Sequence, residues 1–254
     1  MGVVNITPDS FSDGGRFFGA EQAITHARRL AEDGADVIDI GGESTRPGAA
    51  AVSLDEEMGR ILPVLEKIRD LPVSVDTRRP AVMKAVLEAG ASMINDVDAL
   101  TAAGALEAVA KSGCAVCLMH KKGEPATMQR DPHYDDVVQE VKSYLKERVA
   151  AAEGAGIARA RLVVDPGFGF GKTAQHNLQL LRNLSQISDL PILAGLSRKS
   201  TLGKLTGRPV EERLAGSLAM ALLALQAGAK IVRVHDVRET RDVIAVWEAF
   251  RNEP

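Results

Sequence analysis

A carboxylate followed by a glycine-rich loop is the feature of this sequence most suited to chemistry. The stretch Arg161 to Thr173, RLVVDPGFGFGKT, begins with a β-branched run typical of a buried parallel strand, and Asp165 stands at its carboxyl end. Pro166 fixes one backbone angle and removes a donor, while the glycines that follow permit backbone geometry that side chains forbid. We interpret this loop as shaped for the close approach of a ligand.

Two phosphate-binding motifs come close to fitting this stretch, and we reject both. The sequence GKT from Gly171 would end a P-loop, but the first glycine of that motif would fall on Pro166. The glycines also match a dinucleotide fingerprint, yet its acidic residue would be Asp189, which precedes a strand instead of ending one. The loop therefore predicts a ligand of another kind.

Polar side chains recur along the chain, each at the end of a short apolar run. In chain order they are Asn5, Asp39 with Glu43, Asp76, Asn95 with Asp96, His120, Asp165, Ser197 with Lys199, and Arg233 with His235. A single polar residue after a strand is usually a helix cap or a turn residue, and we expect that role for Asp39, Asp96 and His120. The repetition at every strand end predicts a shared functional face.

The apolar runs themselves predict strands over residues 3–6, 36–40, 73–75, 92–95, 115–119, 162–164, 192–194 and 231–234. Helical patterns lie between them, over residues 21–32, 54–69, 80–88, 105–111, 134–152, 177–185, 210–226 and 237–250. This alternation without a change of composition favours a single (β/α)₈ TIM barrel of the α/β class, with one domain over residues 1–254. A doubly wound sheet is the structural alternative.

The first two loops that follow strands are longer than a connection requires. They read TPDSFSDGGRF from Thr7 and GGESTRPGA from Gly41, and they are rich in Gly, Ser and Asp. Active sites of such barrels are built from the loops at the carboxyl ends of the strands. We therefore interpret both as mobile catalytic loops.

Composition excludes several classes of partner. The 254 residues carry a net charge of −3 without a block of like charge, so we expect neither nucleic acid nor an anionic membrane as partner. The two cysteines argue against a disulfide scaffold, and Cys114 and Cys117 lie on opposite faces of a strand, where they cannot share a metal. Without a signal-peptide pattern or an apolar run of bilayer length, we expect a cytoplasmic protein.

Several motifs together resemble bacterial dihydropteroate synthases. They are MGVVNITPDSFSDGG, GGESTRPGA, SVDTRRP, INDV, LMH, DPGFGFGK, LSRKS and RVHD, and they follow one another at the strand ends identified above. The resemblance implies an enzyme that joins 6-hydroxymethyl-7,8-dihydropterin pyrophosphate to 4-aminobenzoate with Mg²⁺ and releases pyrophosphate in folate biosynthesis. Family members usually carry a segment before the first strand, which leaves open whether this sequence is complete.

The resemblance also implies roles for individual residues. Those implied to bind the pterin are Asp76, Asn95, Met119, Asp165, Phe170 and Lys199. Those implied to bind 4-aminobenzoate, where sulfonamides would compete, are Thr45, Arg46, Phe170, Lys199 and Ser200. A carboxylate on a rigid strand end suits the adjacent N–H donors of a dihydropterin ring, so we assign that contact to Asp165.

A leaving pyrophosphate needs positive charge where negative charge develops. The resemblance implies that it is bound by Asn5, Arg46, Arg233 and His235. Mg²⁺ would be bound by Asn5, with Asp13 as a second candidate ligand. The residues implied to be catalytic are Asp13, Lys199, Arg233 and His235. Because the pterin ring can donate electron density to its methylene, we predict SN1-like cleavage of the C–O bond before the amine attacks.

Two other functions fit a pterin-binding barrel. A corrinoid-linked pterin methyltransferase would keep counterparts of Asp76, Asn95 and Asp165, but it would not need the two long loops. A non-catalytic barrel would keep the pocket without turnover. The motifs GGESTRPG and SRKS with RVHD favour the synthase. We also expect the apolar helix over residues 215–226 to supply part of a homodimer face.

Overall fold

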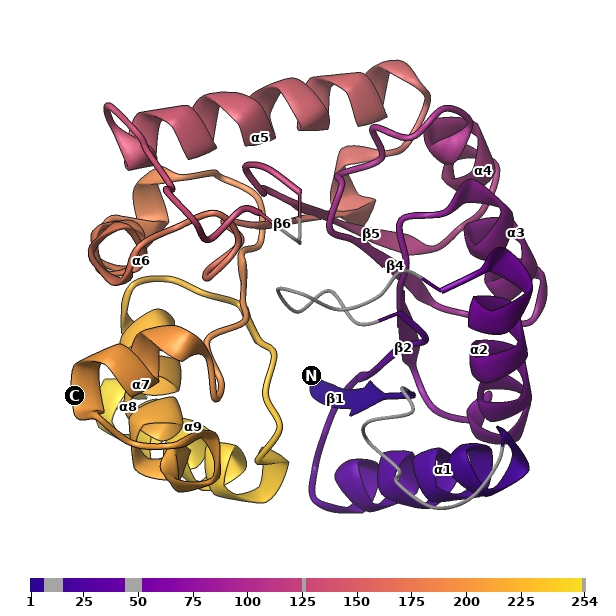
Figure 1. The fold of residues 1–254 in the computed structure, drawn as a ribbon, viewed down its shortest axis with the longest axis horizontal. Coiled ribbons are helices and arrows are strands. Elements are labelled where there is room, and N and C mark those ends of the chain that lie inside the picture. Colours follow the sequence, from indigo (N-terminus) through magenta and orange to yellow (C-terminus); the bar gives the residue numbers. More distant parts are fainter. Residues whose placement is uncertain (7–15, 44–51, 125–126, 253–254) are drawn as a thin grey trace.

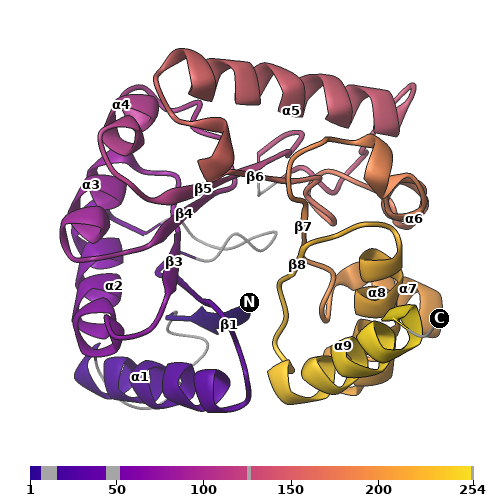
Figure 2. The same cartoon turned by 180° about the vertical axis from the view of Figure 1, so that it is seen from behind.

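A ring of parallel strands forms the centre of the molecule, and helices surround it (Figures 1 and 2). The structure is a computed structural model that describes residues 1–6, 16–43, 52–124 and 127–252. Its strands are β1 (Gly2–Asn5), β2 (Ile38–Gly41), β3 (Val73–Asp76), β4 (Met93–Asp96), β5 (Ala115–Met119), β6 (Leu162–Asp165), β7 (Leu193–Ala194) and β8 (Ile231–Val232).

Neighbouring strands pair in chain order, and single bridges close the ring. The order runs from β1 to β6, and β7 pairs with β8. Val164 on β6 bridges to Ile192 just before β7, and Val234 just after β8 bridges to Gly2 on β1. The amide of Val234 also donates to the carbonyl oxygen of Met1 at 3.0 Å. The predicted (β/α)₈ barrel is therefore confirmed, and the doubly wound alternative is wrong.

The helices pack outside the ring (Figure 1). They are α1 (Arg16–Glu32), α2 (Leu54–Ile68), α3 (Pro80–Glu88), α4 (Ala105–Ala110), α5 (Val137–Gly154), α6 (Ala174–Arg182), α7 (Ser200–Thr206), α8 (Leu214–Gln226) and α9 (Val237–Asn252). Within the described ranges, none of them is long and apolar enough to cross a membrane. Short 3₁₀ turns lie at Arg159–Arg161, Leu184–Gln186 and Val210–Glu212.

Capping side chains explain where the observed helices differ from the predicted ones. The carboxylate of Asp136 accepts hydrogen bonds from two amides of the first turn of α5, so this helix begins at residue 137 and not at 134. Thr173 forms a capping box with His176, so α6 begins at residue 174 and not at 177. Both differences follow from side chains outside the apolar pattern.

The prediction of one continuous helix over residues 210–226 is wrong. A 3₁₀ turn ends at Glu212, and α8 begins only at Leu214. Between them Arg213 has non-helical backbone angles of φ −92° and ψ 13°. Its guanidinium reaches away from the helix and donates to the carbonyl oxygens of Arg208 and Arg198, both at 3.0 Å. These contacts hold the chain in a bend before α8.

Alternation along the strands decides which side chains enter the barrel. A buried cluster of Met1, Met93, Cys117, Val163 and Leu193 is separate from the larger core, which includes strand residues and the residues of the helices that surround them. Side chains two positions further along the same strands share the face of this cluster. The strand-end residues Asn95, Met119 and Asp165 therefore point into the barrel at its carboxyl end.

Candidate active site

The register of the sheet brings the strand-end residues into two rows, one two residues beyond the other along the strands. Asp76 pairs with Asn95 across β3 and β4, and Met119 pairs with Asp165 across β5 and β6. Asn5 ends β1 in the row of Asp76 and Asn95 and is half-buried. These side chains come from five strands that are far apart in the sequence, so only the closed barrel gathers them.

Arg233 lies between the carboxylates of Asp39 and Asp76. Its Nε donates to Asp39 Oδ2 at 2.6 Å, and its Nη2 donates to Asp76 Oδ2 at 3.2 Å. Asn95 Nδ2 also donates to Asp39 Oδ2, at 3.4 Å. Burial acts to lower the pKa of Arg233, but the two carboxylates raise it on balance. Asp39 is fully buried within β2, so the expectation that it caps a helix or forms a turn is wrong.

Two carboxyl groups of the site are harder to ionise than free ones. Burial raises the pKa of Asp76 to about 7, and Arg233 opposes the shift. Burial also raises the pKa of Asp165, against the charge of Lys199 and a hydrogen bond from its own loop. In that bond the amide of Gly167 donates to Asp165 Oδ1 at 2.7 Å. The loop thereby orients the carboxylate that ends β6.

A buried lysine holds the glycine-rich loop in place. Lys172 Nζ donates to the carbonyl oxygens of Gly167 at 2.9 Å and Phe170 at 3.0 Å, and it lies 2.9 Å from His120 Nδ1. Burial lowers the pKa of Lys172 well below its usual range. Burial and the nearby Lys172 lower the pKa of His120 to about 3, so the imidazole is neutral. The cap or turn role expected for His120 is therefore wrong.

Gly167 permits the close approach of this loop to β5. Its φ is +69°, and an added Cβ would lie 1.8 Å from the carbonyl oxygen of His120. We expect Gly167→Ala to destabilise the protein by more than about 1 kcal/mol and to lower its melting temperature. Gly113→Ala is the matched control, because a Cβ there meets nothing within 4 Å. Thermal unfolding followed by circular dichroism compares the two, and equal melting temperatures would contradict the expectation.

Lys199 reaches this loop from the segment that follows β7, the strand next to β6. Its Nζ donates to the carbonyl oxygen of Phe168 and lies 4.7 Å from the centre of the Phe170 ring. Burial lowers the pKa of Lys199 to about 8, and Asp165 opposes the shift. Ser200 follows as the first residue of α7 and is exposed. The ammonium of Lys199 thus acts on the carboxylate of Asp165 and lies beside the Phe170 ring.

The loops after β7 and β8 are joined through side chains that the sequence places in two motifs. Ser197 Oγ lies 3.0 Å from His235 Nδ1 and accepts a hydrogen bond from the amide of His235 at 3.3 Å. Arg198 Nε donates to Asp236 Oδ2 at 3.0 Å. These contacts fix His235 two residues after Arg233, on the same edge of the barrel.

Two other strand-end residues have structural partners. Asp96 accepts hydrogen bonds from the amides of Asp98 and Leu100, both at 2.8 Å, which confirms the predicted turn role. Glu43 forms ion pairs with Arg78 and Arg79, each at 3.2 Å. These two carboxylates therefore hold loops at the rim of the barrel.

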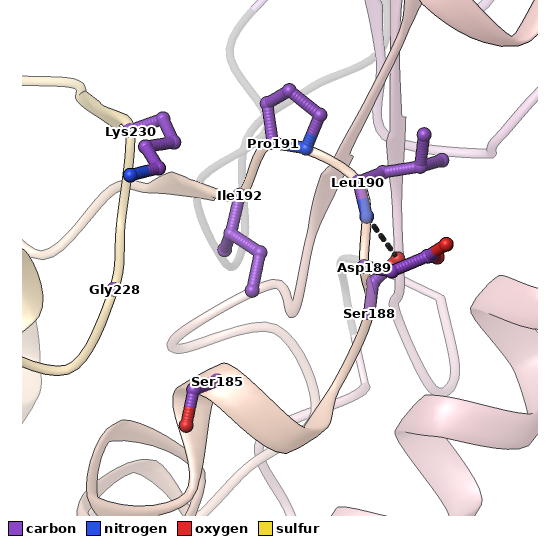
Figure 3. A pocket seen from close by; sticks show the side chains of 8 residues that line it. All are labelled: Ser185, Ser188, Asp189, Leu190, Pro191, Ile192, Gly228 and Lys230. Atoms are coloured by element: carbon purple, nitrogen blue, oxygen red, sulfur yellow. Dashed lines mark hydrogen bonds between the residues drawn. The ribbon is translucent and has the colours of Figure 1, made fainter.

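Two hollows of the described surface lie away from these residues. One of about 240 Å³ opens at the amino-terminal ends of β7 and β8 and is lined by Ser185, Ser188, Asp189, Leu190, Pro191, Ile192, Gly228 and Lys230 (Figure 3). Another of about 300 Å³ lies between α7 and α8. Neither contains a strand-end residue. We locate the candidate site by the convergence of charged side chains at the opposite end of the barrel.

Comparison with known proteins agrees with this geometry. The family model described as "Pterin binding enzyme" matches residues 1–235. A dihydropteroate synthase of Escherichia coli (strain K12) is 50% identical over 254 residues, covering 98% of this chain and 90% of the relative. That of Haemophilus influenzae is 48% identical and covers 99% of this chain and 94% of the relative. The chain belongs to the dihydropteroate synthase family.

Solved structures of this family share the whole fold. The Xanthomonas albilineans dihydropteroate synthase with 4-aminobenzoic acid has a TM-score of 0.95 and 55% sequence identity, and the match covers 100% of this chain and 93% of that one. A Yersinia pestis dihydropteroate synthase with a sulfonamide drug has a TM-score of 0.94 and 48% identity, over 100% of this chain and 94% of that one. The barrel of this chain is thus the barrel of the family.

Part of the predicted site falls outside the described structure. Asp13, Thr45 and Arg46 belong to the ranges 7–15 and 44–51, which the structure does not describe. Sequence reasoning also missed two residues. Asp39 lies within a strand, and Lys172 was compared only with a P-loop lysine, although a charged residue within a buried segment is itself a signal of a polar partner.

The described residues allow a test of the Mg²⁺ that the family resemblance implies. Outside the undescribed ranges, no group of three His, Cys, Asp or Glu side chains could hold a metal ion. Mg²⁺ is often bound by one or two protein oxygens together with substrate phosphates and water. Asn5 offers one such oxygen at the end of β1. The single oxygen of Asn5 therefore fits a Mg²⁺ ion whose other ligands come from pyrophosphate and water.

Proposed function

We propose that this protein is a dihydropteroate synthase, a transferase that condenses 6-hydroxymethyl-7,8-dihydropterin pyrophosphate with 4-aminobenzoate to 7,8-dihydropteroate and pyrophosphate in folate biosynthesis. The observation that carries the proposal is the family match over nearly the whole chain at about 50% identity. Related structures hold 4-aminobenzoic acid, 7,8-dihydropteroate or a sulfonamide drug. We propose that the present chain binds the same ligands.

The pterin ring is proposed to bind in the barrel mouth. The carboxylate of Asp165 accepts hydrogen bonds from the N–H donors of the pyrimidine edge, while Asp76 and Asn95 meet the remaining polar edges. Lys199 donates to the ring carbonyl and nitrogen. Met119, next to Asp165 in the sheet, supplies an apolar surface for the flat ring.

The 4-aminobenzoate is proposed to bind between the glycine-rich loop and α7. Its ring would pack beside Phe170 and the stem of Lys199, whose ammonium lies near the Phe170 ring. Its carboxylate would accept a hydrogen bond from Ser200. Thr45 and Arg46 complete this proposed site from the second loop. Sulfonamides are proposed to compete here.

The pyrophosphate is proposed to bind beside Arg233 and His235. When the C–O bond breaks, its electron pair leaves with the pyrophosphate, and the charge of Arg233 stabilises that group together with His235 and Arg46. Asn5 would hold Mg²⁺, with Asp13 as a further candidate, and the ion would supply additional positive charge to the leaving group. The amine of 4-aminobenzoate then forms the C–N bond and releases a proton.

We propose that C–O cleavage precedes amine attack and that the pterin substrate binds first. With enzyme, Mg²⁺ and pterin pyrophosphate labelled with ¹⁸O at the bridging position, the label should move slowly to non-bridging positions without 4-aminobenzoate. Asp13→Ala should suppress this positional isotope exchange. No exchange, together with tight binding of 4-aminobenzoate to the empty enzyme, would instead indicate direct displacement.

A direct assay distinguishes the synthase from the two alternative functions. A corrinoid-linked methyltransferase would release no pyrophosphate, and a non-catalytic barrel would bind the pterin without turnover. The related proteins with about 50% identity are synthases, which favours the synthase here. A coupled assay should detect pyrophosphate release that depends on 4-aminobenzoate. Methyl transfer, or pterin binding without release, would exclude the proposed function.

We further propose that the protein forms a homodimer through α8 and its neighbours. Large apolar side chains of this region are exposed: Leu205, Val210, Leu214, Leu223, Val246 and Phe250. They lie on α7, α8 and α9 and on the turn before α8, and exposed apolar side chains gathered on neighbouring elements are typical of protein–protein contacts. Light scattering at micromolar concentration should give twice the mass of one chain, and Leu223→Glu should shift the protein towards the monomer. A wild-type mass of one chain would contradict the proposal.

We also infer a cytoplasmic location from the composition.

A further inference from the structure

One buried side chain joins the two walls of the proposed 4-aminobenzoate site. Asn177 lies on α6 with 2% of its surface exposed. Its Oδ1 accepts a hydrogen bond from the amide of Gly169, and its Nδ2 donates to Thr201 Oγ1, both at 2.9 Å. Gly169 precedes Phe170 in the glycine-rich loop, and Thr201 follows Ser200 in α7. A single amide group thus links the loop after β6 to the first turn of α7.

The chemistry of an amide is what this position requires. Asn177 Nδ2 also donates to the carbonyl oxygen of Thr173 at 2.9 Å, so the side chain accepts one hydrogen bond and donates two. A carboxylate would lack the donors, and an apolar residue would leave the amide of Gly169 and the hydroxyl of Thr201 without this partner. The link between the two walls therefore depends on Asn at this position.

Neighbouring groups have supports that do not involve Asn177. Arg213 donates to the carbonyl oxygens of Arg198 at 3.0 Å and Lys199 at 3.4 Å, which holds the backbone before α7. Lys172 holds the carbonyl oxygen of Gly167 at the start of the glycine-rich loop. Loss of the Asn177 link should therefore leave Asp165 and Lys199 in place and should move Ser200 relative to Phe170.

We propose that Asn177 is a positioning residue that, through Thr201, sets the separation of Phe170 and Ser200 and thereby the affinity for 4-aminobenzoate. The inference rests on the proposed function, because it takes the substrate from there. It adds a residue that touches neither substrate. The affinity for 4-aminobenzoate should change more than the affinity for the pterin, since Asp165 and Lys199 keep hydrogen bonds that do not involve Asn177.

Thr201 offers the sharper test, because Thr201→Val removes the hydroxyl with little change of shape and Thr201→Ser keeps it. Steady-state kinetics should show a rise of about tenfold in KM for 4-aminobenzoate in Thr201→Val and in Asn177→Ala. The KM for the pterin substrate and kcat should change by less than about twofold, and Thr201→Ser should resemble the wild type. If Asn177→Ala does not fold, the comparison of Thr201→Val with Thr201→Ser still tests whether the link sets the KM for 4-aminobenzoate.

A double-mutant cycle tests whether the two residues act as one link. The double variant Asn177→Ala/Thr201→Val should be no worse than Asn177→Ala alone, because Asn177→Ala already removes the one bond that Thr201→Val removes. Equal rises in both KM values, or a lower melting temperature with an unchanged KM for 4-aminobenzoate, would overturn the proposal. Failure of the proposed function is a different result, since the wild-type protein would then form no 7,8-dihydropteroate at all.

Discussion

Arg233→Met should destabilise the protein by roughly 3–5 kcal/mol, because it leaves two carboxylates at the mouth of the barrel without their shared cation. The side chain of Asp39 is fully buried and that of Asp76 is 14% exposed, so water cannot replace the guanidinium at either group. Urea unfolding measures the loss. Arg28→Met is the matched control, because the ion pair of Arg28 with Asp70 is exposed and should contribute little.

The loss of unfolding free energy caused by Arg233→Met should also depend on pH. The pKa of Asp76 is 3.8 when unperturbed and is raised by burial to about 7 in the fold, so its contribution to stability is present below about pH 4 and is lost as pH rises through 7. Arg233 lowers this pKa, so its removal raises the pKa further and increases the cost of ionising Asp76. The deficit should be larger at pH 8 than at pH 5. A deficit that is equal at both values would contradict the buried-pair account.

Asp165→Asn should weaken pterin binding by roughly 1–3 kcal/mol, because one N–H donor of the ring would then face an N–H donor of the side chain. The shape of the side chain hardly changes, and the amide of Gly167 can still donate to the remaining oxygen. Titration calorimetry with the pterin substrate measures the effect. Asp189→Asn is a control, since that carboxylate is exposed and pairs with Arg159 far from the site.

The outcome for Asp165→Asn also tests the division of the pocket. Pterin affinity should fall most, and 4-aminobenzoate should lose affinity only through the ordered binding of the two substrates. Unchanged pterin binding with a collapse of 4-aminobenzoate binding would show that the assignment of the two subsites is wrong.

The barrel was predictable because short apolar runs typical of strands alternate with helical patterns along the whole sequence. A β-branched run followed by Asp165 or Asn95 carries both the strand and its functional end in a few adjacent residues. Helix boundaries were less predictable, since Asp136 and Thr173 set them through hydrogen bonds to first-turn amides and not through apolar periodicity. Local patterns thus predict the elements better than their ends.

Hydrogen bonds and ion pairs between residues far apart in the chain could not be predicted from the sequence. Asp39 contacts Arg233, which lies 194 positions later in the chain, and Lys172 contacts His120, 52 positions earlier. Nothing near Asp39 in the sequence distinguishes a turn residue from the partner of a buried arginine. Only closure of the strands into a ring brings such groups within hydrogen-bond distance.

Product formation tests the central claim most directly. The purified protein, with Mg²⁺, 6-hydroxymethyl-7,8-dihydropterin pyrophosphate and isotope-labelled 4-aminobenzoate, should convert the label into 7,8-dihydropteroate detected by mass. Asp165→Asn should reduce this conversion, and Asp189→Asn should not. Binding of the pterin by the wild-type protein without any labelled dihydropteroate would contradict the account.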